Sequence, residues 1–201
     1  MFEWPFILDF WFGPLDDDGV PGKSYREQWF SVNRRFDWGL RRRFSSMVLL
    51  ASEEGLDHWR REPGGALAEI LLLDQFSRNI YRRTAMAFQN DSLAQRLARE
   101  GVERGDDVRL ALIQRAFFYM PYQHAENRTL QQESVALYEQ LVRTASGRLR
   151  DVLDGFYQSA QRHQALIERF GRFPHRNATM KRTSSTAEKA FLAGNEQSFG
   201  Q

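Results

Sequence analysis

Apolar residues recur along most of the chain at intervals of three and four, and no run alternates as a strand would. This pattern predicts an all-α protein, with about eight helices forming an antiparallel array or superhelix. No linker or low-complexity stretch divides residues 1–201, so we expect a single domain. The expected helices lie at 5–12, from about 25, at 36–52, 66–81, from 91 (with Asp91 as N-cap) to 101 or 105, and at 109–120, 129–144, 149–170 and 186–193.

The segment 66–81 is apolar on nearly every side in its first half, as is typical of a buried central helix. Asp74 and Arg78 lie one turn apart on one face and can pair, so we expect both to be buried. Gln75 and Asn79 repeat the same spacing. Because burying even a paired carboxylate costs several kcal/mol, stability alone is a weak reason to keep this pair.

A histidine interrupts the inward stripe of the helix expected at 149–170. The stripe is apolar on both sides of His163. A lone histidine at such a position is more often a hydrogen-bonded core residue than a catalytic one.

Two further polar clusters lie at helix ends, where side chains can face a cleft. The first contains His124 and Glu126. The second, 171–177, combines Gly171, which can end a helix, with the stiffening Pro174. Four polar clusters in a helical chain predict one shared site. Its candidate ligand-binding residues are Asp74, Gln75, Arg78, Asn79, His124, Glu126, His163, Arg172, His175, Arg176 and Asn177.

Composition limits the kinds of site and partner that we expect. Lys and Arg number 28 against 26 Asp and Glu, a net charge of +2 that gives no support for nucleic-acid binding. The chain has no cysteine, and its histidines and acids lack the HExxH spacing of a zinc helix, so we expect neither a metal nor a cofactor. The N-terminus has no basic region before its apolar residues, and no apolar run could span a bilayer. These features favour a cytoplasmic protein without membrane contacts.

Four segments carry a family resemblance: ILDFWFG at 7–13, LLLDQFSRNIYR at 71–82, FFYMPYQHAE at 117–126 and HQALIERFGRFPHRN at 163–177. In this order, and with the later STAE at 185–188, they resemble bacterial domain-of-unknown-function family 924. The resemblance implies an α-helical, tetratricopeptide-like fold and no assigned activity. Arg83 and Lys181 depart from the family pattern, which tends to have a small residue at the first position and Gly at the second. A positive φ at Lys181 would strain its backbone.

Three functions are compatible with these residues. The first is binding of an anionic small molecule or an acidic peptide end in a pocket lined by the arginines and histidines. The second is an enzyme with His124 or His163 as general acid or base. The third is an interaction scaffold, or a homodimer, in which the polar clusters only fix helix packing. The aromatic N-terminus could dock a partner or cap the core.

Overall fold

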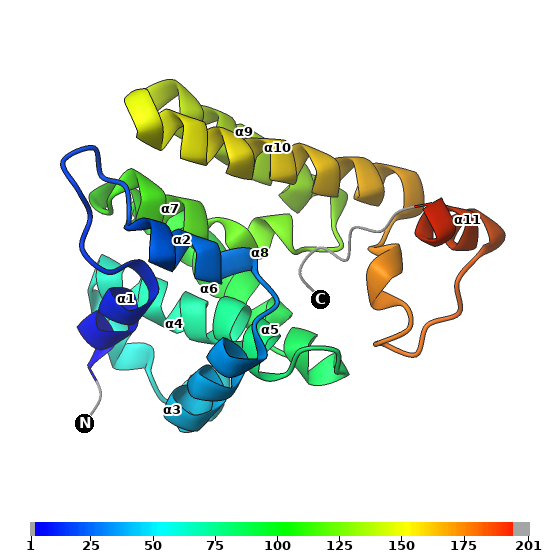
Figure 1. Cartoon of the computed structure of the whole chain (residues 1–201), viewed down its shortest axis with the longest axis horizontal. Helices are drawn as coiled ribbons and strands as arrows, with labels where there is room; N and C mark the ends of the chain where they lie inside the picture. Colours follow the sequence, from blue (N-terminus) through cyan, green and yellow to red (C-terminus); the bar gives the residue numbers. More distant parts are fainter. Residues whose placement is uncertain (1–2, 195–201) are drawn as a thin grey trace.

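The computed structural model describes residues 3–194, which form helices joined by loops (Figure 1). Within these residues there is no strand, and Leu15 and Pro21 form an isolated antiparallel bridge. The all-α prediction is therefore confirmed. No helix in this part of the chain combines the length and hydrophobicity needed to cross a bilayer.

The α-helices are α1 (Trp4–Phe12), α2 (Lys23–Phe30), α3 (Arg34–Ser52), α4 (Pro63–Leu71), α5 (Ser77–Ile80), α6 (Asp91–Arg104), α7 (Leu112–Phe118), α8 (Met120–Gln123), α9 (Arg128–Thr144), α10 (Gly147–Phe170) and α11 (Thr186–Gly194). Short helical turns link them: η1 (Asp57–Arg61), the π-helical η2 (Leu72–Phe76), η3 (Ala85–Phe88), η4 (Asp107–Arg109) and η5 (Pro174–Arg176).

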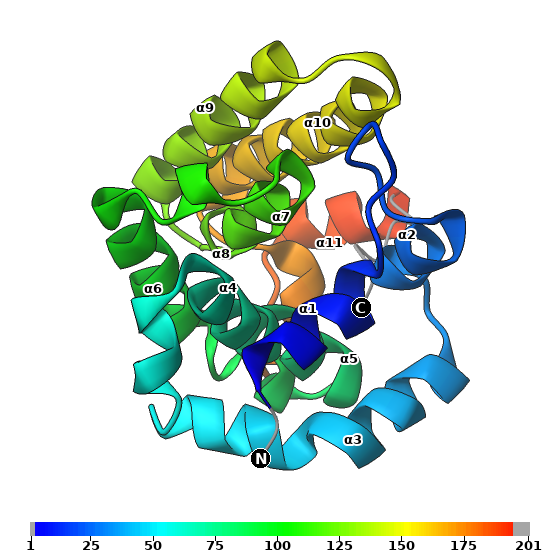
Figure 2. The same cartoon turned by 90° about the vertical axis from the view of Figure 1, so that its left-hand side faces the viewer.

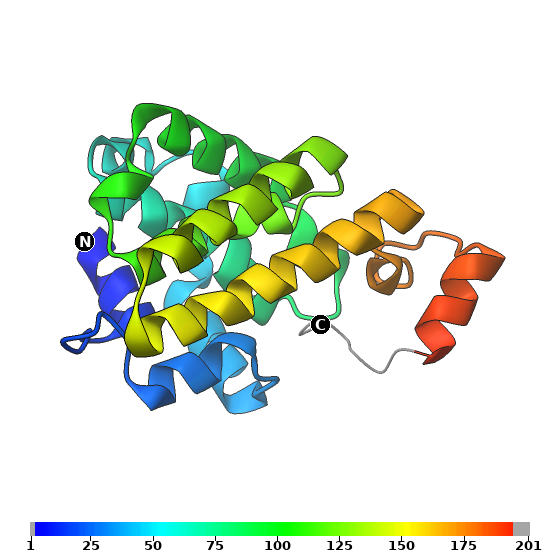
Figure 3. The ribbon, with the colours of Figure 1, turned by 90° about the horizontal axis from the view of Figure 1, so that it is seen from above.

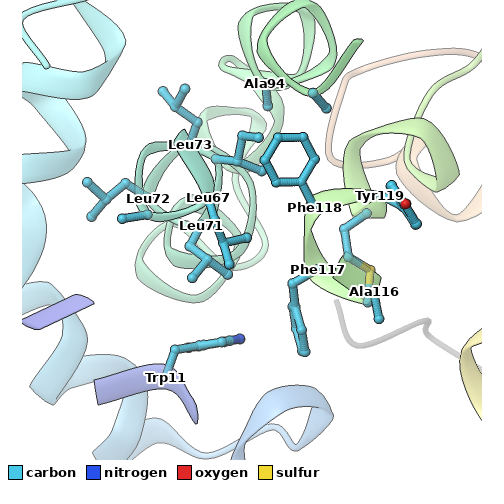
Figure 4. Packing of buried hydrophobic residues seen from close by; sticks show 14 of the residues in the cluster. Trp11, Leu67, Leu71, Leu72, Leu73, Ala94, Ala116, Phe117, Phe118 and Tyr119 are labelled. Carbon is cyan, nitrogen blue, oxygen red and sulfur yellow. The ribbon is translucent and has the colours of Figure 1, made fainter. Parts of the chain in front are cut away.

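The helix expected at 66–81 is a continuous buried rod made of α4, η2 and α5. Pro63 lies in its first turn, where a missing N–H is tolerated, and every residue of the rod is buried. Figure 4 shows its leucines meeting side chains from α1, α6 and α7. At η2 the rod widens into a π-turn, which the periodicity does not predict. Such turns are frequent at functional sites, and this one contains Asp74.

Aromatic residues attach the N-terminal helix to this rod. Trp11 lies 5.4 Å from Phe76 and 5.7 Å from Phe117, measured between ring centroids. Phe12 is buried as well, whereas Phe6 is 42% exposed. Of the two possibilities for the N-terminus, its residues 7–12 thus serve mainly to cap the core.

The helices α9 and α10 form a long antiparallel pair along one side of the molecule (Figures 2 and 3). The inward stripe expected for α10 is buried from Leu149 to Ile167, His163 included, and ends at the partly buried Phe170. The helices around the rod do not visibly repeat this pairing (Figure 2). The tetratricopeptide-like repetition stays a prediction.

Several helix boundaries differ from expectation. Asp91 is the first residue of α6 and Asn90 is its N-cap, so Asp91 is free for other contacts. The helix expected at 109–120 is shorter: α7 ends at Phe118, and Pro121 lies in the first turn of the short helix α8 that follows. Both family departures, Arg83 at φ 63° and Lys181 at φ 55°, occupy the left-handed region. The strain that a positive φ would impose at Lys181 is therefore present, and it also applies to Arg83.

Candidate functional site

Five charged or titratable residues from four segments meet beside η2. We call them the inner cluster: Asp74, Arg78, Asp91, His124 and Arg176. Arg78 Nη1 lies 2.8 Å from Asp74 Oδ1 and 2.9 Å from Asp91 Oδ1, and Arg176 Nη1 donates to Asp91 Oδ2 at 3.0 Å. The segments are thus held together through ion pairs at the point where the central rod ends.

The inner cluster is balanced in charge and largely buried. Asp74, Arg78 and Arg176 are buried, and Asp91 is 12% exposed at its side chain. The two guanidinium groups face two carboxylates, which offsets the cost of removing each charge from water. Two aromatic rings flank the second arginine: the Arg176 guanidinium carbon lies 4.5 Å from the ring centroid of Phe88 and 4.7 Å from that of Phe173.

His124 is oriented by the carboxylate of Asp74. Its Nδ1 lies 2.7 Å from Asp74 Oδ1, while Gln75 Nε2 donates to Asp74 Oδ2 at 2.6 Å. An ionised carboxylate only accepts hydrogen bonds, so Nδ1 carries the ring proton and Nε2 keeps its lone pair. Nε2 makes no hydrogen bond to the described residues, and the side chain is 13% exposed.

Burial and neighbouring cations set the protonation states of this pair. Burial, and after it the charge of Arg78, lowers the pKa of His124 below 6.5, so the ring is neutral at pH 7. Burial alone would raise the pKa of Asp74, but its charged neighbours outweigh burial and lower it. Because His124 is neutral, Arg78 is the cation that keeps Asp74 ionised. The pair is therefore a carboxylate beside a neutral imidazole.

His163 lies next to the inner cluster. Its ring centroid is 6.2 Å from that of His124, and its Nδ1 donates to the Ser159 carbonyl at 2.8 Å. Burial, then the proximity of His124, lowers its pKa to about 3. A bond to the carbonyl one turn back is a common arrangement for a core histidine.

The remaining candidates from the C-terminal part form a second group, which we call the C-terminal anchor. The Glu126 carboxylate accepts hydrogen bonds from both Nη atoms of Arg182, at 2.6 and 2.9 Å, and from the backbone N–H of Phe173. Arg172 pairs with Glu188 through two bonds of 2.6 and 2.8 Å. These contacts join the segment after α10 to the loop before α9 and to α11.

The three candidates that remain are Asn177, His175 and Asn79. Asn177 donates to Ser184 in the C-terminal anchor. His175 lies 5.5 Å from Phe173 between ring centroids, and burial lowers its pKa to about 3. Asn79 donates to Asp37 of α3 at 3.0 Å, on the side of the rod where Arg82 binds the same carboxylate.

The structure thus groups six of the eleven sequence candidates at or beside the inner cluster: Asp74, Gln75, Arg78, His124, His163 and Arg176. Sequence reasoning missed Asp91. Its position at the start of a helix suggested an N-cap, so its ion pairs with Arg78 and Arg176 were not expected. Within residues 3–194, no group of three or more histidine and acidic side chains is arranged to hold a metal ion.

Comparisons with known proteins agree with this architecture. The solved structure of ATU0120, a protein of unknown function from Agrobacterium tumefaciens, is similar to this chain with a TM-score of 0.81 and 33% identity, over 96% of this chain and 97% of that one. No curated protein matches. A family model described as "Bacterial protein of unknown function (DUF924)" matches residues 7–196. The chain therefore belongs to this bacterial family, DUF924.

Proposed function

We propose that the protein is an enzyme that transfers a proton to or from a small polar substrate, with His124 as the general base. The Asp74–His124 pair carries this proposal. A carboxylate that holds one imidazole nitrogen leaves the other nitrogen basic and fixed in direction, as general-base catalysis requires. The neutral state of His124 at pH 7 fits the same role, because a protonated imidazole could not accept a proton.

Arg176 supports the proposal because it could stabilise the negative charge that develops on a substrate when His124 removes a proton. Two of its nitrogens are engaged, by Asp91 and by the His124 carbonyl. Its Nε is buried and has no hydrogen-bond partner among the described residues. A buried donor of this kind is costly unless it meets an acceptor. Such an acceptor could be the oxygen of a substrate that loses its proton to His124.

The experiment screens purified protein against chromogenic esters, amides, phosphate esters and glycosides, in parallel with H124Q. We expect an activity that falls about 100-fold or more in the variant and that rises with pH through the lowered pKa of His124. His58, exposed on η1, supplies the matched control H58Q, which should keep full activity. Equal activity of H124Q and the parent protein would contradict the role of His124.

Anion binding without turnover is a second candidate, and the unpaired Nε of Arg176 also favours it. It has less support than acid–base chemistry, since Asp91 already occupies both arginines of the inner cluster. Thermal-shift measurements with phosphate and small carboxylates test it. Arg172 supplies the control, because its guanidinium binds Glu188 and lies outside the inner cluster. Stabilisation by a ligand that is lost in R176Q but kept in R172Q would support binding. Absence of both activity and ligand stabilisation would favour a structural network.

A further inference from the structure

One face of α3 is unusual in combining exposed arginines with exposed apolar side chains. The helix lies along one edge of the molecule, and no other labelled helix covers its outer side (Figures 1 and 2). Its inner face packs Leu40, Phe44 and Val48 into the core. We call the opposite side the outer face of α3. Its exposed residues are Arg34, Arg35, Trp38, Arg41, Arg42, Ser46 and Leu49.

The positive charge of α3 is local. The helix has five arginines and one acid, a net charge of +4, whereas the whole chain carries +2, so the other residues together carry −2. The single acid, Asp37, is engaged by Arg82 and Asn79. None of the five arginines makes an ion pair with the described residues. The charge on this face is therefore not neutralised within the described part of the molecule.

Stability gives no reason for this arrangement. Arg34 and Arg35 lie in the first turn of α3, where cations oppose the helix dipole. Arg41, Arg42 and Arg43 add three more positive charges, and none of them has an ion-pair partner among the described residues. An acidic partner would offset the dipole penalty and neutralise the charge of all five arginines.

Large apolar side chains lie among these arginines. Trp38 is 62% exposed, with the Arg42 guanidinium carbon 5.6 Å from its ring centroid. Leu49 is 58% exposed, and Phe30, just before the helix, is 57% exposed. Tryptophan and arginine are the residues that most often dominate protein–protein binding energy.

We propose that the outer face of α3 binds an acidic, amphipathic helix of a partner protein. Its carboxylates would pair with Arg34, Arg41 and Arg42, and its apolar residues would cover the exposed tryptophan and leucine. A bilayer surface fits less well, because Ser45 and Ser46 separate Trp38 from Leu49 and leave no continuous apolar stripe to insert. A nucleic acid fits less well too, because its bases stack on aromatic rings and would leave Leu49 without a partner.

The test measures fluorescence anisotropy of a labelled peptide of about 20 residues, the length that matches α3 at about 1.5 Å per residue. The peptide carries Glu and Leu at helical spacing, and a second peptide has Gln in place of every Glu. We expect saturable binding of the acidic peptide only, weakened about tenfold or more in the triple variant W38A/R41Q/R42Q. The control V108A/R150Q/R162Q changes one equally exposed apolar residue and two exposed arginines on other elements, and it should bind as the parent does.

Four outcomes would overturn the proposal. The first is absence of binding to the acidic peptide, and the second is equal binding by W38A/R41Q/R42Q. The third is tighter binding, through the same residues, of phosphatidylserine vesicles or of a single-stranded oligonucleotide. The fourth is self-association in analytical ultracentrifugation that W38A/R41Q/R42Q abolishes, since the occupant would then be a second copy of the chain. Circular dichroism of each variant verifies that the helical fold is intact.

Discussion

The buried charges beside η2 depend on one another more strongly than surface ion pairs do. Asp74 contacts Arg78, His124 and Gln75 at distances between 2.6 and 2.8 Å, away from screening by water. Asp91 in turn serves two arginines. Removing one charge therefore unbalances several partners.

We predict that D74A lowers the free energy of unfolding by about 3 kcal/mol, because two buried guanidinium groups would then share the carboxylate of Asp91. Urea denaturation measures this loss. The exposed Asp151 on α10 provides the control D151A, which should change stability by about 0.5 kcal/mol at most.

A second variant separates charge imbalance from loss of packing. In D74A/R78M the pair of Arg176 and Asp91 stays balanced, so part of the stability should return. A loss in D74A below about 0.5 kcal/mol would mean that the ion pair behaves as an exposed one.

The first turn of the central rod packs closely against η1, and this contact fixes the position of the rod. An added Cβ at Gly65 would lie 2.1 Å from the backbone oxygen of Trp59 in η1, so this glycine allows the two backbones to approach. Glu69, the charged residue of α4, is buried and held by Arg60 at 2.7 and 2.8 Å. The rod that carries Asp74 is thus positioned from its opposite end.

Substitution of Gly65 by alanine should destabilise the protein by about 3 kcal/mol, since a backbone carbonyl cannot yield as a flexible side chain can. Gly155, in the exposed face of α10, has no atom within 4 Å of an added Cβ. G155A should therefore stabilise by about 1 kcal/mol through helix propensity. Thermal unfolding of both variants checks the contrast, and similar effects of the two would show that Gly65 has no packing role.

For the whole molecule, buried histidines link folding to pH. Burial lowers the pKa of His163 and of His175 to about 3 each, whereas an unfolded histidine titrates near 6.5. Between these values the unfolded chain binds protons that the folded chain does not. Stability is therefore complete above pH 6.5 and decreases as the pH falls from 6.5 towards 3.

We expect His163 and His175 to contribute a loss of about 4 kcal/mol between pH 7 and pH 5, about 2 kcal/mol each. His124, whose pKa burial also lowers, adds to this loss with the same sign. Urea titrations at several pH values measure it. H163Q should remove about 2 kcal/mol of this loss, while H58Q, at an exposed position, should leave the loss unchanged. Constant stability from pH 7 to pH 5 would contradict neutral burial of these side chains.

Hydrophobic periodicity sufficed to predict the helices, the buried stripe of α10 and the burial of Asp74 and Arg78, because these depend on contacts within one helix. The strain at Lys181 was indicated by the family resemblance instead, because the family tends to have Gly at this position. The π-turn at η2 did not, since a single extra residue in one turn leaves little trace in a three- to four-residue repeat.

The grouping of the site depended on how distant segments pack. Asp91 meets Arg176 across 85 positions of sequence, and His124 meets Asp74 across 50. Asn79 lies on the same helical rod as Asp74 yet faces α3, and Arg172 follows the helix of His163 yet binds Glu188. Local spacing specifies which face of a helix is buried, but an ion pair between segments forms only where the fold brings two charges within a few ångströms. For this reason the chain alone identified the polar residues, and their partners came from the packing of the helices.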